Sequence, residues 1–269
     1  MEEDLKEKCL AVFRRIQASN PLVHHITNLV VANDNANTML AVGALPVMAY
    51  AEEEVEEMVA AAQALVINIG TLTREVVRSS ILAGKRANML GIPVVFDPVG
   101  VGATAFRTAS AQTILQEVRV AVVRGNASEV AALLGRRAPI RGVESSGEIP
   151  DVALLAGEAA RRFGATVAVT GKIDLVSDGE RIIRIENGDV LLTRVTGTGC
   201  MATSLCGACV AVEEDASLAA SAALGFLGVC AEIAALSSHG PGSFRYALFD
   251  TMYSLSEEEF LQRLRIEVI

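Results

Sequence analysis

The chain has 269 residues, 51% of them hydrophobic, and a formal net charge of −9 at pH 7. This length suffices for one large hydrophobic core or two modest ones. The acidic balance argues against general DNA or RNA binding, which depends on neutralising phosphates, but a small anionic ligand can still be held by backbone amides and a few arginines.

The chain begins with an acidic segment, Met1 to Asp4, which has neither the basic start nor the apolar run of a signal peptide. Apolar residues then recur at helical spacing from Leu5 to Ile16, which predicts an amphipathic helix. Pro21 ends this helix, because proline cannot continue the hydrogen-bond ladder.

Apolar segments that are typical of strands alternate with helical segments over the next 150 or so residues. This alternation predicts an α/β fold with a largely parallel central sheet and helices on both faces. The predicted strands are residues 47–50, 64–69, 93–96, 120–123 and 167–169, and the predicted helices are residues 52–63, 73–90, 108–118 and 128–134.

The pattern changes after Gly171. Residues 174–185 predict a hairpin that turns at Asp178-Gly179. Residues 190–195 predict one more strand, and residues 201–212 predict a helix. Residues 136–150 look like a surface loop rather than a domain boundary, so we expect a single domain over residues 1–269.

Residues 216–236 form an apolar run in which Glu232 is the single charged residue. The run is long enough to cross a membrane, which takes roughly 20 apolar residues. It is mostly Ala, Ser and Gly, without a flanking aromatic belt or basic cluster, so we predict a buried helix and no membrane partner. The five cysteines are irregularly spaced, which fits a reducing compartment, and we expect the cytoplasm.

The predicted strands end in polar residues. In a parallel α/β sheet, ligands bind beyond the carboxyl ends of the strands. We therefore expect a ligand site that is lined by Asn68, Asp97, Arg124, Asn126 and Thr170.

The turn Thr196-Gly197-Thr198-Gly199-Cys200 precedes a predicted helix. Its glycines allow a tight turn that presents backbone amides to an anion, such as a phosphoryl group in transfer. A plain turn is one alternative. A dinucleotide-binding fingerprint over Gly197, Gly199 and Ala202 is another, disfavoured because it comes late in the chain and the next acidic residues follow too soon. The sequence contains no Walker A motif.

Two acidic residues could organise Mg²⁺. The Asp97 carboxylate is a hard oxygen ligand, although Asp-Pro is equally a common start of a turn. Arg124 could clamp phosphate oxygens and Glu129 could reach the metal through water. The alternative is that Ser128 caps a helix and Glu129 complements its dipole.

Cys200 is a candidate nucleophile or base, because a helix N-terminus lowers the pKa of a thiol. The alternative is a small buried residue. The three histidines are remote in sequence, so their spacing supports no Cys–His dyad. Cys206 and Cys209 lie on an apolar run and are interpreted as core residues rather than as half of a metal site.

Six ordered motifs together resemble the hydroxyethylthiazole kinase family, which has the ribokinase-like fold. They cover nearly the whole chain and are more specific than the glycine turn alone. The motifs are residues 21–28 (PLVHHITN) with 35–37, 43–49 (GALPVMA), 96–104 (FDPVGVGAT), 124–129 (RGNASE), 169–171 with 176–179, and 195–200 (VTGTGC).

The resemblance implies ATP- and Mg²⁺-dependent phosphorylation of the hydroxyl group of 4-methyl-5-(2-hydroxyethyl)thiazole, which salvages the thiazole half of thiamine. By position, it places the thiazole at Asn28, Met48 and Gly197, the ATP phosphates at Arg124, Asn126 and Thr170, Mg²⁺ at Asp97 and Glu129, and an anion hole at Gly197, Thr198, Gly199 and Cys200. Cys200 stands where related enzymes have an aspartate base.

The resemblance also implies a homotrimer with its sites at subunit interfaces. His25 and Lys172 depart from the residues typical of their motifs. Three other functions stay open at this point: a kinase of the same fold for another small alcohol such as hydroxymethylpyrimidine or a sugar, a non-catalytic nucleotide or thiazole sensor, and an NAD-binding oxidoreductase.

Overall fold

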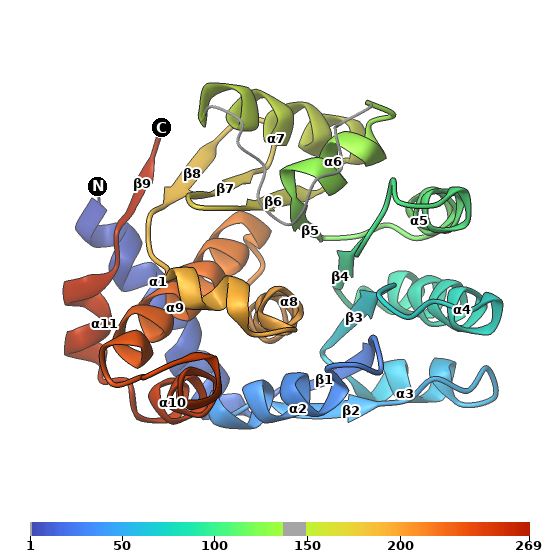
Figure 1. Ribbon diagram of the computed structural model, residues 1–269. Coiled ribbons are helices and arrows are strands. Elements are labelled where there is room, and N and C mark those ends of the chain that lie inside the picture. The colour runs from blue at the N-terminus through green and yellow to red at the C-terminus, as the bar shows by residue number, and fades with distance from the viewer. Residues whose placement is uncertain (1, 137–148) are drawn as a thin grey trace.

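A computed structural model of the chain describes residues 2–136 and 149–269. One sheet runs through the middle of the molecule with helices on both sides (Figure 1). Its nine strands are ordered β2-β1-β3-β4-β5-β6-β7-β8-β9. They are β1 Leu22–Ile26, β2 Leu45–Met48, β3 Ala64–Asn68, β4 Val94–Asp97, β5 Val122–Asn126, β6 Thr166–Thr170, β7 Asp174–Ser177, β8 Ile182–Ile185 and β9 Ile266–Val268.

The six strands from β2 to β6 are parallel, and the pairs from β6 to β9 are antiparallel. The predicted parallel sheet and the predicted hairpin at residues 174–185 are both confirmed. Residues 64–69 and 93–96 were recognisable because a parallel strand covered on both faces is a continuous apolar run.

The helices form a layer on each face of the sheet, joined to the strands by short loops. They are α1 Glu2–Ser19, α2 Ala32–Ala41, α3 Val55–Ala61, α4 Arg74–Leu90, α5 Ala105–Glu117, α6 Ala127–Leu133, α7 Ile149–Phe163, α8 Thr198–Val210, α9 Ala216–Leu236, α10 Pro241–Ser254 and α11 Glu257–Arg263. Figure 1 shows α3, α4 and α5 on one side of the sheet and α1, α8 and α9 on the other.

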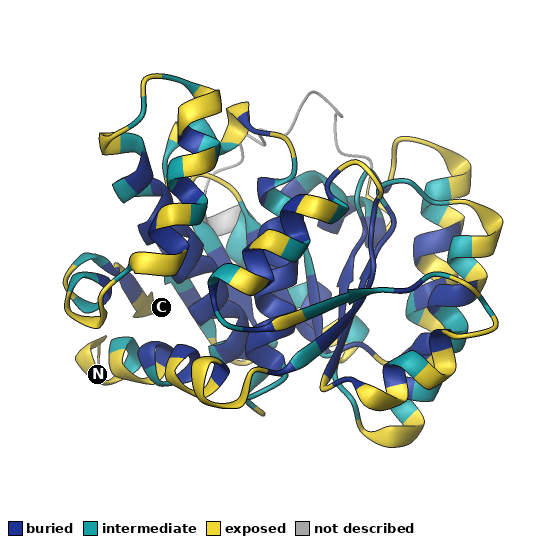
Figure 2. Cartoon of the chain, turned by 90° about the horizontal axis from the view of Figure 1, so that it is seen from below, coloured by how far each residue is buried: buried dark blue, intermediate teal, exposed yellow. Residues whose placement is uncertain are grey.

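Successive side chains of a strand point to opposite faces, so each face has a core of its own. In β3, Val66 packs in the core under α8 and α9, whereas Leu65 and Ile67 pack in the core under α3 to α7. Figure 2 shows the strands buried in the middle and the exposed residues on the outer sides of the helices.

Helix α9 has the length and composition of a membrane span, but 78% of its most apolar window is buried inside the molecule. Its small residues let α8, α10 and α1 approach it closely. Cys206 and Cys209 of α8 are buried in the same core, and neither forms a disulfide. The predictions of a buried helix and of core cysteines are confirmed.

The prediction of a strand at residues 190–195 is wrong. Residues Val190–Arg194 form a 3₁₀-helix, η1, in which the Asp189 side chain accepts a hydrogen bond from the Leu191 N–H group at 2.8 Å. This cap favours a helical turn over an extended strand. The helix that follows begins at Thr198 and not at residue 201.

The apolar pattern alone missed β1, α2, α7 and β9 and misplaced several ends by two or three residues. The strand predicted at residues 47–50, for example, is β2 at Leu45–Met48. Strand β1 was hidden because two of its five residues are His24 and His25, which are both fully buried. Residues 137–148 of the predicted surface loop lie outside the described residues.

Candidate active site

The parallel strands bring their polar ends to one edge of the sheet. Asn68 lies beside Asp97 in the pairing of β3 with β4, and Asn126 lies beside Thr170 in the pairing of β5 with β6. The N-terminus of α8 meets this edge, because Cys200 bonds to Asn68. The expected convergence of the strand ends on the 196–200 turn is therefore present.

Asp97 is fully buried at the end of β4. Its Oδ2 atom accepts hydrogen bonds from Thr203 Oγ1 at 2.6 Å and from Asn68 Nδ2 at 3.1 Å, and lies 3.6 Å from Arg124 Nη1. Its Oδ1 atom has no hydrogen-bond partner among the described residues. Burial raises the pKa of Asp97 above its usual range, and the charge of Arg124 limits the rise.

Arg124 spans the gap between Asp97 and the end of β6. Besides the ion pair with Asp97, its Nη2 atom donates to Thr170 Oγ1 at 2.5 Å. A Cβ at residue 199 would lie 2.8 Å from Arg124 Nη1, so the guanidinium lies directly over the first turn of α8. Its planar fork suits phosphate oxygens.

Gly197 is the N-cap of α8 and has a φ of 92°, in the left-handed region that glycine adopts without strain. The first hydrogen bond of the helix runs from the Met201 N–H group to the Gly197 carbonyl at 2.8 Å. The N–H groups of Thr198, Gly199 and Cys200 therefore stand outside the helical ladder, where they can bind an anion.

Cys200 is held by two carboxamides. Asn28 Nδ2 and Asn68 Nδ2 each donate to its Sγ atom at 3.2 Å. Burial raises the pKa of the Cys200 thiol to about 11, with a further contribution from the Asp97 charge. This burial outweighs the lowering expected from the helix N-terminus, so the thiol is neutral at pH 7.

Glu129 joins two loops of the site. Its Oε1 atom accepts from the Gly100 N–H group at 2.8 Å and its Oε2 atom from the Asn126 N–H group at 2.9 Å. Asn126 Oδ1 in turn accepts from the Glu129 N–H group, which makes Asn126 the cap of α6 in a capping box. The alternative in which Ser128 caps this helix is wrong.

The structure brings Asn28, Asn126, Thr170 and the other strand ends together, and it places Met48, half-buried, at the end of edge strand β2, where it pairs with His25 of β1. Asn68 is the residue that sequence reasoning undervalued. It was named as a polar strand end and given no role, although its position beside Asp97 in neighbouring strands was the available signal.

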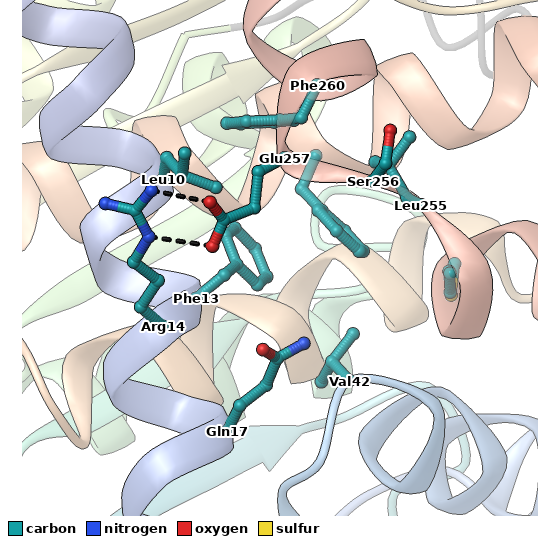
Figure 3. Close-up of a pocket in the computed structure, with 11 residues that line it drawn as sticks. Leu10, Phe13, Arg14, Gln17, Val42, Leu255, Ser256, Glu257 and Phe260 are labelled. Carbon is teal, nitrogen blue, oxygen red and sulfur yellow. Dashed lines mark hydrogen bonds and ion pairs between the residues drawn. The ribbon is translucent and has the colours of Figure 1, made fainter.

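A separate cavity of about 40 Å³ lies away from this edge, among α1, α9, α10 and α11 (Figure 3). Phe13 and Phe260 line it, and Arg14 forms a double hydrogen bond with Glu257 beside it. Ligand pockets usually have volumes of roughly 300–1,000 Å³, so this cavity is too small to compete as the active site.

Comparison with known proteins places this geometry in a family. Residues 13–258 match the model of the hydroxyethylthiazole kinase family. The hydroxyethylthiazole kinase of Moorella thermoacetica is 53% identical over 95% of this chain and 96% of its own length. The structure of hydroxyethylthiazole kinase protein from Pyrococcus horikoshii is 45% identical, with a TM-score of 0.91 over 98% of this chain and 99% of that one.

More distant structures share the fold alone. A ribokinase-like superfamily protein from Enterococcus faecalis is 12% identical and has a TM-score of 0.65 over 96% of this chain and 95% of its own. The predicted ribokinase-like architecture is thus confirmed, with its mostly parallel sheet between two layers of helices. Both the motifs and the structure lead to one conclusion: the chain belongs to the hydroxyethylthiazole kinase family.

Proposed function

We propose that the chain transfers the γ-phosphoryl group of ATP to the hydroxyl group of 4-methyl-5-(2-hydroxyethyl)thiazole, with Mg²⁺. One observation supports the proposal most strongly. The backbone amides at the first turn of α8, those of Thr198, Gly199 and Cys200, lie beside the Asp97–Arg124 ion pair. Phosphoryl transfer needs little covalent chemistry from the protein, so positioned donors and charges supply most of the catalysis.

The residues near Asp97 fit a magnesium ion. Asp97 Oδ1 is buried and has no hydrogen-bond partner within residues 2–136 and 149–269, and a carboxylate oxygen is a ligand that Mg²⁺ prefers. Asp97 would hold the ion, with Glu129 reaching it through water because both Glu129 oxygens already accept backbone N–H groups. Bound Mg²⁺ would neutralise charge on the phosphates of ATP.

The remaining residues have separate roles. Arg124 and Thr170 bind phosphate oxygens, and Asn126 holds the loop beside them. Asn28, Met48 and Gly197 bind the thiazole. In the transfer, the substrate oxygen bonds to the γ-phosphorus as the bond to the ADP oxygen breaks, and the hydroxyl proton is released to solvent. The amides of residues 198–200 stabilise the charge on the moving group. The neutral Cys200 thiol orients the attacking hydroxyl.

The functional unit in this proposal is a homotrimer with the thiazole site between neighbouring subunits. Its support is the apolar surface beside Asn28, where Leu29 is 72% exposed and Val30 is 68% exposed. Leu45 is also exposed, on edge strand β2. The proposed compartment is the cytoplasm, which suits five free cysteines.

An ADP-release assay tests the proposal. Purified protein with ATP, Mg²⁺ and the thiazole alcohol is expected to produce ADP, and removal of the alcohol or of Mg²⁺ should abolish the signal. Hydroxymethylpyrimidine serves as the competing alcohol. A higher kcat/KM for hydroxymethylpyrimidine would contradict the proposed substrate, and ATP binding without turnover would contradict the kinase activity.

A further inference from the structure

Asn68 uses the whole hydrogen-bonding capacity of its carboxamide at the centre of the site. It is 2% exposed. Its Oδ1 atom accepts from Asn28 Nδ2 at 3.1 Å and from the Gly70 N–H group at 2.9 Å. Its Nδ2 atom donates to Asp97 Oδ2 at 3.1 Å and to Cys200 Sγ at 3.2 Å. A carboxamide has two donor hydrogens and two acceptor lone pairs, so no capacity is left over.

The chemistry of the partners fixes which way this carboxamide points. The Gly70 N–H group can only donate, so the Asn68 atom that faces it is the carbonyl oxygen. The nitrogen then faces the Asp97 carboxylate, which accepts. Because Asn68 presents its oxygen to Asn28, the Asn28 amide also has one orientation, with its nitrogen toward Cys200.

This arrangement leaves the sulfur of Cys200 as the acceptor of two N–H groups. Neither bond uses the proton of the thiol, so that proton is available to the site. On the other side of Asn68, Asp97 Oδ2 is held by Asn68 and Thr203, while Oδ1 has no partner among the residues that the structure describes. One side chain therefore contacts both of the groups that the proposed reaction needs, Cys200 and Asp97.

We propose that Asn68 is a positioning residue of the phosphoryl transfer, which acts through Cys200 and Asp97 by way of its Nδ2 group and orients the thiazole-binding Asn28 by way of its Oδ1 atom. The inference rests on the proposed function. It assigns different consequences to the two halves of the carboxamide: loss of the donor half disturbs the catalytic step, and loss of the acceptor half disturbs thiazole binding.

Two variants separate the halves. Asn68→Asp keeps the shape and the oxygen that Gly70 and Asn28 contact, but it replaces the donors to Cys200 and Asp97. At saturating Mg²⁺, kcat is expected to fall about 30-fold while the KM for the thiazole alcohol stays within about 3-fold, since misplacement by 1 Å can cost about 10² in rate. Asn68→Ala removes both halves and is expected to lower kcat similarly and to raise this KM by about 10-fold.

Asn88 provides a matched control. Its carboxamide also holds backbone, with Oδ1 accepting from the Arg119 N–H group at 2.7 Å and Nδ2 donating to the Arg119 carbonyl at 2.8 Å, beside the amino end of β4. Asn88→Asp makes the same chemical change away from the site. It is expected to lower the melting temperature without changing kcat.

A double-mutant cycle tests whether Asn68 acts through Cys200. We compare the fold loss in kcat that Asn68→Asp causes in two backgrounds. In a Cys200→Ala background this loss is expected to be smaller than in the wild type by a factor of at least about 5, because the shared contact is already gone. Strictly multiplicative losses would show that Asn68 and Cys200 act independently and would overturn this part of the proposal.

Alkylation of Cys200 gives a readout that needs no turnover. Cys200 is half-buried and the other four cysteines are buried, so iodoacetamide reports on this thiol in the folded protein. Asn68→Asp removes a donor to Sγ and adds negative charge, and both lower the thiolate fraction, so the rate at pH 8 should fall by at least about 3-fold.

The outcomes separate the two proposals. A wild-type protein that does not turn over the thiazole alcohol contradicts the proposed function, while the alkylation rates still decide the role of Asn68. An Asn68→Asp variant with both kcat and alkylation rate equal to those of the wild type overturns the inference. If Asn68→Asp and Asn68→Ala both fail to fold, Asn68 is structural and the inference is wrong.

Discussion

A Cβ added to Gly199 would come within 2.8 Å of Nη1 of Arg124. The backbone of α8 accepts alanine at this position, because residue 199 is helical and alanine favours helices over glycine by about 1 kcal/mol. The atom that must move is the end of the flexible Arg124 side chain. Gly199→Ala therefore separates folding from function.

We expect Gly199→Ala to keep or raise the melting temperature and to lower kcat/KM for ATP by about 10-fold or more, since removal of one well-placed donor can cost about 10²–10³ in rate and the substitution only displaces this one. Steady-state kinetics with varied ATP provide the measurement. Gly240→Ala is the control, because a Cβ there meets no atom within 4 Å. Equal ATP kinetics for Gly199→Ala and wild type would contradict a phosphate-binding role for Arg124.

Asp97→Asn should raise the magnesium requirement. The substitution keeps the shape of the side chain but removes the charge of a buried group whose Oδ1 atom has no hydrogen-bond partner in the described part of the chain. We expect the Mg²⁺ concentration for half-maximal activity to rise about 10-fold, which corresponds to about 1.4 kcal/mol of binding free energy. Asp215→Asn, at the N-cap of α9, is the control. If the Mg²⁺ concentration for half-maximal activity were the same in Asp97→Asn and in the wild type, Asp97 would not be a ligand of the metal.

Cys200→Asp should retain substantial activity, whereas Cys200→Ala should lose about 10-fold in kcat, which is less than the roughly 10²–10⁴-fold expected for loss of a general base. The thiol has a pKa of about 11, so at pH 7 it orients the substrate hydroxyl rather than deprotonates it. A carboxylate in its place can take the proton. The measurement is kcat of both variants at pH 7. If Cys200→Ala were as active as wild type, the thiol would have no part in the reaction.

His25 should make the protein sensitive to acid. Burial lowers the pKa of His25 from 6.5 to about 4, because a charged imidazole cannot be solvated inside the sheet. The neutral form is therefore the folded one. The contribution of His25 to the free energy of unfolding is fully present above pH 6.5 and is lost as the pH falls toward 4. In that range the unfolded chain binds a proton at His25 and the folded chain does not.

The expected loss in the free energy of unfolding is about 3 kcal/mol between pH 7 and pH 4, from a lowering of roughly 2.5 pH units. Urea unfolding at a series of pH values measures it. His25→Asn has no group that titrates in this range and should flatten the profile by that amount. The exposed His239 is the control, and a profile that follows His239→Asn instead would contradict the assignment.

The proposed trimer predicts a solution mass three times the 28.3 kDa of one chain. Leu29→Glu places a charge on the exposed apolar surface next to Asn28 and should shift the mass toward that of one chain and raise the KM for the thiazole alcohol. Light scattering after gel filtration checks the first effect. Met89→Glu, an equally exposed residue at the end of α4, should leave the mass unchanged.

Strands such as β3 and β4 could be predicted because they are short apolar runs that end in polar residues. The sheet order then puts Asn68 beside Asp97, and the position of the site follows from topology. Strand β1 could not be predicted in this way, because only the tertiary structure shows that His24 and His25 are buried and neutral. Residues 190–194 have the apolar pattern of a strand, but the Asp189 side chain caps them as a 3₁₀-helix, which the pattern does not reveal.

The hydrogen-bond partners of individual side chains could not be predicted either, because they too depend on the tertiary structure. The contact between Asn28 and Cys200 joins residues that are 172 positions apart, and spacing carries no information about it. The pKa of the thiol likewise depends on its burial in the first turn of α8, whereas the helix N-terminus alone suggested the opposite direction. The motifs named the candidate residues, and the structure adds the burial and the contacts that shift their pKa values.

The separation of Asn28 and Cys200 also bears on synthesis of the protein. A ribosome adds about 5–20 residues each second, so Asn28, Asn68, Asp97 and Arg124 emerge well before the helix that completes their site. A nascent chain lacks the anion hole until residues 198–200 have left the exit tunnel. In the proposed function, ATP is therefore expected to stabilise chains that extend past α8 and not shorter ones.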